Sequence, residues 1–158
     1  MLGLFLILPV FAIFAEDLDG ATPLLIGLAV GIYGLTQAIL QIPFGLLSDR
    51  IGRKPVILGG LLLFAIGSVI AATAEDIWMI MIGRAIQGSG AIAAAVMAMV
   101  ADLTRDSQRT RAMATVGMTI GASFALSLMM GPGLYQSIGM SGIFWLTGAF
   151  AVIGILIV

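Results

Sequence analysis

The sequence contains no cysteine and no histidine, and it carries little charge. The two missing residue types exclude disulfides, thiolate or imidazole metal sites, and catalysis by a Ser-His or Cys-His pair. Charged residues make up 9% of the 158 residues, against about a quarter in soluble domains. Seven basic and eight acidic residues leave a net charge of −1, so no basic excess is present to bind nucleic acid. We expect neither a metal nor another cofactor.

Hydrophobic residues are abundant instead, at 61% of the chain, and they form long blocks between charged clusters. A helix that spans a bilayer needs about 20 mostly apolar residues. The charged clusters divide the chain into six apolar segments, at residues 1–15, 23–47, 55–74, 78–101, 112–135 and 143–158. This pattern predicts an all-α polytopic transmembrane helix bundle surrounded by membrane lipid, with no soluble domain between the helices.

The first and last segments are short for a membrane span. Fifteen residues at about 1.5 Å each reach only about 22 Å, less than the ~30 Å hydrocarbon core. Residues 1–15 hold no Lys or Arg, whereas a signal peptide begins with positive charge. We therefore expect both ends to be cut points of a longer protein.

The charges in the loops are sorted by sign. Six of the seven basic residues follow the second and fourth segments: Arg50, Arg53, Lys54, Arg105, Arg109 and Arg111. The loops on the other side carry only acidic residues: Glu16, Asp17, Asp19, Glu75 and Asp76. The positive-inside rule therefore predicts that the Arg-rich loops are cytoplasmic.

Arg84 is the only charged residue inside an apolar segment, and Gln87 shares its helix face. A charge at that depth usually faces a cavity or a partner, which favours a functional role. The alternative is a side chain that snorkels to the outer interface.

A polar stripe follows the second segment, where Tyr33, Gln37 and Gln41 recur every four residues. Polar atoms that face lipid would lack hydrogen-bond partners, so the stripe must face protein or water. It either lines a solute cavity or bonds to neighbouring helices, and the sequence favours neither.

Small residues recur at helix-packing spacing. Gly27 with Gly31, Gly117 with Gly121, and the series Gly83, Gly88 and Gly90 each allow close approach of two helix backbones. Such density predicts a compact bundle.

Three motifs point to a family. Residues 45–55, GLLSDRIGRKP, fit the pattern G-x-L-[AS]-D-R-x-G-R-K, and residues 84–91, RAIQGSGA, fit R-x-x-Q-G-x-G-A. Gly131-Pro132 matches the start of G-P-x-x-G-G, but Tyr135-Gln136 stand where that motif has two glycines. The chain resembles the major facilitator superfamily, and within it the drug/proton antiporter-like transporters of bacterial inner membranes.

The resemblance implies a fold and residue roles. The chain would be the N-terminal six of twelve helices, two inverted three-helix repeats, with the C-terminal six-helix half missing. The residues of the loop motif would latch the two halves during gating: Gly45, Asp49, Arg50, Gly52, Arg53, Lys54 and Asp102. Arg53 would pair with Asp102, and Asp49 would face a helix N-terminus in the second half. The alternative is that the basic residues only set topology.

The other two motifs imply roles in coupling. Arg84, Gln87 and Gly88 would serve proton coupling, and Gly131 with Pro132 would be a remnant of the antiporter motif. No Asp or Glu lies inside any of the six segments away from their ends.

The predicted function is secondary active transport of a small solute by alternating access, as proton-coupled efflux. The alternatives are an uncoupled facilitator and a six-helix membrane module without transport. An enzyme is not expected, because the sequence shows no clustered acids, metal ligands or activated nucleophile.

Overall fold

The computed structural model describes the backbone of residues 2–15, 20–90 and 92–158. The acidic residues Glu16, Asp17 and Asp19, and Ala91 of the second motif, lie outside the described residues. The described chain folds into α1 (Leu2–Ala15), α2 (Pro23–Ile51), α3 (Arg53–Ala72), α4 (Ile77–Ser89), α5 (Ala93–Leu103), a short 3-10 turn η1 (Asp106–Gln108) and α6 (Arg109–Ile157). The described residues form no strand, which confirms the all-α prediction.

Four helical stretches are long and apolar enough to cross a membrane among the residues described: Pro23–Ile51, Arg53–Ala72, Ile77–Leu103 and Asp106–Ile157. Two of them begin at capped ends. The Thr22 side chain accepts a hydrogen bond from the amide of Leu25 at 3.2 Å, and the Asp76 carboxylate accepts one from Met79 at 2.7 Å. Such caps satisfy backbone donors that have no partner within the first turn.

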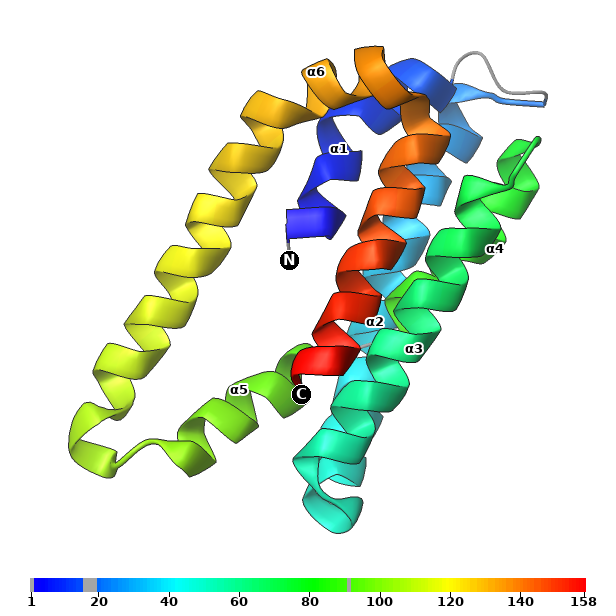
Figure 1. The fold of residues 1–158 in the computed structure, drawn as a ribbon. Helices are drawn as coiled ribbons and strands as arrows, with labels where there is room; N and C mark the ends of the chain where they lie inside the picture. Colours follow the sequence, from blue (N-terminus) through cyan, green and yellow to red (C-terminus); the bar gives the residue numbers. More distant parts are fainter. Residues whose placement is uncertain (1, 16–19, 91) are drawn as a thin grey trace.

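The fifth and sixth predicted segments are joined differently from the expectation. In place of a turn over residues 136–142, two helical stretches of α6 meet at a kink, where only Gly139 leaves helical geometry, at φ 68° and ψ −177°. The 49 residues of α6 at about 1.5 Å each reach about 74 Å, enough for two crossings. α6 rises on one side of the molecule, bends at the top and descends beside α3 (Figure 1).

The fourth predicted segment, residues 78–101, is interrupted. α4 ends at Ser89 and α5 starts at Ala93, and the amide of Ile92 donates to the carbonyl of Gly90 at 2.7 Å. α3 passes close to this break, because a Cβ added at Gly90 would lie 2.3 Å from the carbonyl oxygen of Gly60. A helix with ordinary side chains could not approach so closely.

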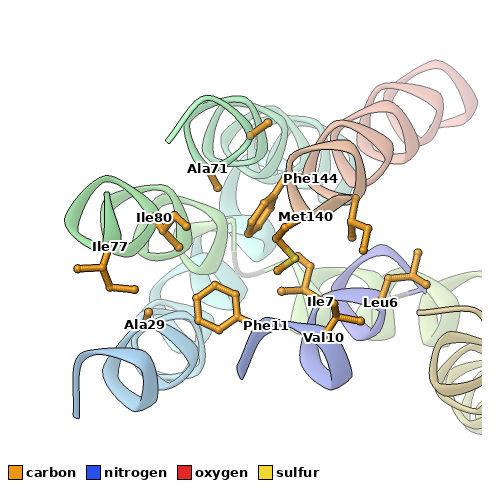
Figure 2. Packing of buried hydrophobic residues seen from close by; sticks show 12 residues of the cluster. Leu6, Ile7, Val10, Phe11, Ala29, Ala71, Ile77, Ile80, Met140 and Phe144 are labelled. Atoms are coloured by element: carbon orange, nitrogen blue, oxygen red, sulfur yellow. The ribbon is translucent and has the colours of Figure 1, made fainter. Parts of the chain in front are cut away.

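The main hydrophobic core joins five helices at one end of the bundle (Figure 2). Its buried members are Leu6, Ile7, Val10 and Phe11 of α1, Ala29 of α2, Ala71 and Ala72 of α3, Ile77 and Ile80 of α4, and Met140, Ile143 and Phe144 of α6. α1 thereby fixes α6 to the rest of the bundle just after the Gly139 bend. A smaller cluster of Val56, Ile57 and Ala95 lies near the opposite end.

The glycines divide into those that pack helices and those that do not. A Cβ added at Gly83 would meet backbone atoms of Ala71 and Gly67 at 2.8 to 2.9 Å, so α3 and α4 cross here in near contact. By contrast, a Cβ added at any glycine of the two predicted pairs would meet nothing within 4 Å: Gly27, Gly31, Gly117 and Gly121. The predicted packing at those four positions is not present in the described chain, whose surface there remains open.

Candidate functional site

A tight turn connects α2 to α3 and positions the charged residues of the loop motif. Gly52 ends α2 and precedes α3 with φ 100° and ψ 156°. Residues that carry a side chain rarely adopt this backbone conformation, so the motif needs glycine here. The turn places Arg53 at the first position of α3, facing back toward the last residues of α2.

The Arg53 guanidinium joins the ends of three helices. Its Nε donates to Asp102 Oδ2 of α5 at 2.9 Å, and its Nη1 donates to Ser48 Oγ of α2 at 2.7 Å and also contacts the Asp49 carboxylate. The predicted pair of Arg53 with Asp102 is therefore formed. Asp49, expected to face a helix of the second half, has Arg53 as its partner here.

Solvent reaches this cluster. The side chains of Arg53, Asp49 and Asp102 are 23%, 56% and 58% exposed. Exposed ion pairs contribute little to stability, so the cluster can form and break at small cost. Arg50 is exposed and takes part in none of the described ion pairs. Lys54 donates from Nζ to the carbonyl of Val158 at 2.9 Å, which connects the turn to the end of α6.

Arg84 of α4 lies in the interior of the bundle. The residue is 1% exposed, so its side chain does not snorkel to the surface. Its Nη1 donates to Gln87 Oε1 at 3.0 Å, and its guanidinium carbon lies 4.6 Å from the centre of the Tyr33 ring. Its Nε is buried and has no hydrogen-bond partner.

A chain of buried polar side chains continues from Arg84 across three helices. Gln87 Nε2 donates to Ser68 Oγ of α3 at 2.7 Å, and the Thr147 hydroxyl of α6 lies 3.3 Å from the same oxygen. All four side chains are buried. Because Gln87 is held by Ser68, its amide oxygen points at Arg84 and fixes the guanidinium against Tyr33. Ser68 and Thr147 were not predicted, since single hydroxyl residues in apolar segments carry no distinguishing pattern.

Gly88, from the same motif, brings α2 and α4 together. A Cβ added here would lie 2.3 Å from the carbonyl oxygen of Tyr33 and 2.0 Å from Thr36 Oγ1. The close crossing places the Tyr33 ring over Arg84.

A pocket of about 140 Å³ opens beside this polar chain. Two residues of the predicted stripe, Tyr33 and Gln37, line it, together with Thr147. Gln41 lies outside it. The break between α4 and α5 forms one wall, through Gly90, Ile92 and Ala93. Tyr33 and Thr147 therefore belong both to the pocket and to the surroundings of Arg84.

The antiporter-motif remnant packs against α1. A Cβ added at Gly131 would lie 3.0 Å from the Pro9 ring and 3.4 Å from Val10. Gly131 is buried, whereas Pro132 is exposed. In the described chain this pair positions α6 against α1, away from the pocket.

The family follows from comparison with known proteins. The model of the Major Facilitator Superfamily matches residues 1–158. The chain belongs to the major facilitator superfamily. It is 57% identical over 155 residues to the inner membrane transport protein YajR of Escherichia coli (strain K12), and 46% identical over 158 residues to an uncharacterized transporter of Buchnera aphidicola subsp. Schizaphis graminum. It is 33% identical over 138 residues to the multidrug resistance protein MdtH of Yersinia enterocolitica.

These major facilitator relatives are longer than this chain. The matches cover 98%, 100% and 86% of this chain, but 34%, 40% and 34% of the respective relatives. The chain thus spans between a third and two-fifths of their length.

Proposed function

We propose that the chain is the N-terminal six-helix half of a secondary transporter, which moves a small solute by alternating access as proton-coupled efflux. Its place would be a bacterial inner membrane, with the Arg-rich loops in the cytoplasm. The names of the relatives support transport across an inner membrane, and that of MdtH supports efflux. A C-terminal half would supply the other wall of the solute path.

The observation that carries this proposal is the Arg53 cluster. One guanidinium holds the ends of α2, α3 and α5 through hydrogen bonds that water can replace. Alternating access needs a contact that is stable in one state and broken in the other at small cost. Asp49, Arg53 and Asp102 are therefore proposed as the latch, and Arg84 with Gln87 and Gly88 as the coupling group.

The test for transport uses the native polypeptide in everted membrane vesicles that carry a pH gradient and a pH-sensitive dye. Coupled efflux predicts that an added solute collapses the gradient. Solute movement that does not depend on the pH gradient would instead indicate the uncoupled facilitator. Absence of solute movement for probes of negative, neutral and positive charge would indicate the non-transporting module.

The test for the latch is the substitution Asp102→Asn. It removes the negative charge that pairs with Arg53 and keeps the size of the side chain, so we expect transport to fall several-fold while membrane insertion is unchanged. Asp106→Asn is the matched control, because Asp106 lies just beyond the end of α5, in η1, and pairs with Arg109 at 2.9 Å, outside the cluster. Equal transport by Asp102→Asn and Asp106→Asn would contradict the latch.

A further inference from the structure

The positive charge of Arg84 has no counter-charge within the described chain. The described ion pairs involve Arg53 and Arg109 only, and Arg84 is bonded to the neutral amide of Gln87. It is 1% exposed, and its Nε lacks a partner. A buried charge without an opposite charge is costly, and inside a membrane such a residue usually serves a ligand or an ion path.

The pocket borders the surroundings of this charge. Its wall includes Tyr33, whose ring lies 4.6 Å from the Arg84 guanidinium carbon. Its lining also includes Thr147, which connects to Arg84 through Ser68 and Gln87. Tyr33 therefore borders both the pocket and the guanidinium, whereas Arg84 itself does not line the pocket.

The described residues that line the pocket carry no charge. Its polar lining residues are Tyr33, Gln37 and Thr147, all neutral hydrogen-bonding groups, and no Asp, Glu, Lys or Arg is among the described lining. Arg84 is the buried charge that contacts this lining, through Tyr33, and it adds a positive contribution to the potential in the pocket. In a medium of low dielectric constant, a charge acts strongly over such a separation.

We propose that this pocket binds the carboxylate end of a small organic acid, with Arg84 as the counter-charge and with Tyr33 and Gln37 as hydrogen-bond partners. Arg84 contacts Tyr33 but does not itself line the pocket, so it is a positioning residue rather than a direct ligand. The inference rests on the proposed transport function, because the acid is taken to be the transported solute. It predicts discrimination against cations of the same shape.

The test compares three molecules of nearly equal shape and different charge: benzoate, benzamide and benzamidine. Affinity is measured by calorimetric titration of the purified native polypeptide at pH 7. We expect benzoate to bind about ten-fold or more tightly than benzamide, which is the gain in affinity that one charge-assisted interaction gives. Benzamidine should bind more weakly still. Equal or tighter binding of benzamidine, or no binding of benzoate, would overturn the proposal.

Three variants locate the site. Arg84→Met should reduce the affinity for benzoate to that for benzamide, and Arg84→Lys should keep the preference because it keeps the charge. Ala93→Leu fills the pocket from the break between α4 and α5 without changing any charge, so it should abolish benzoate binding. Because Arg84→Met removes a buried hydrogen bond, Ala93→Leu provides the test if that variant does not fold. Unchanged benzoate affinity in Ala93→Leu would place the binding elsewhere and refute the proposal.

The outcome separates this inference from the proposed function. Transport of solutes without a preference for benzoate would leave the function standing and overturn the organic acid. Benzoate binding that depends on Arg84 and on the pocket, without transport, would support the site and contradict the function.

Discussion

The close crossing of α2 and α4 at Gly88 gives a quantitative prediction for Gly88→Ala. The added methyl group would lie 2.3 Å from the Tyr33 carbonyl oxygen, whereas ordinary contact begins at 3.4 Å. The Thr36 hydroxyl, at 2.0 Å, can rotate away, but the backbone of α2 cannot. α2 and α4 must therefore separate by about 1 Å at this point. Overpacking of this kind costs about 1–3 kcal/mol of folding free energy.

Gly117→Ala is the matched control, because Gly117 is helical and a Cβ added there meets nothing within 4 Å. Each substitution replaces glycine by alanine within a helix, which stabilises the folded state by up to about 1 kcal/mol through helix propensity. The difference between the two variants therefore isolates the clash, and we expect Gly88→Ala to be less stable by about 1–3 kcal/mol. Free energies of unfolding in mixed micelles, measured by denaturant titration, give this difference. Equal stability of the two variants would refute the crossing geometry.

Three further predictions concern stability and are measured by the same titration. Gly139→Ala should cost about 1–3 kcal/mol, because φ 68° with ψ −177° is a conformation that side chains avoid; an unchanged value would exclude the bend. Ser68→Ala should cost about 1–3 kcal/mol, because it leaves the buried amide of Gln87 without its acceptor, and a neutral result would argue against the polar chain. Asp76→Ala should cost about 1 kcal/mol through loss of the cap on Met79, and no loss would show that water replaces the cap.

Apolar length and charge predicted most of the helices. The segment at 55–74 corresponds to α3 at Arg53–Ala72. A long apolar run bounded by charges crosses a bilayer as a helix, because a helix satisfies all its backbone hydrogen bonds internally. The same logic placed a turn between the fifth and sixth segments. It did not predict that a single glycine makes the bend, since this depends on one pair of backbone angles.

The site was predictable where a motif fixed it. The pairing of Arg53 with Asp102 followed from the family resemblance, and Tyr33 and Gln37 followed from helical spacing. The roles of Ser68 and Thr147 did not follow from the sequence, because their place in the polar chain depends on where α3 and α6 meet α4. Glycine spacing correctly indicated close packing at Gly83, Gly88 and Gly90, but it was wrong for the pairs on the second and fifth segments, for the same reason. Gly27 and Gly117 have the expected periodicity, yet the packing is made by Gly67 with Gly83, which lie on different helices.

The contact between α3 and α4 also bears on how the chain enters the membrane. An arginine near the middle of a helix raises the cost of inserting that helix alone by about 3 kcal/mol. Only residues 73–76 separate α3 from α4, and Ser68 of α3 already bonds to Gln87, the partner of Arg84. The two helices should therefore leave the translocon as a hairpin, with α3 arriving first as the surface on which α4 buries its charge. An insertion assay on α4 with and without α3 measures that assistance. The hydrogen bonds that satisfy Arg84 and Gln87 in the folded bundle would then also determine which helix must insert first.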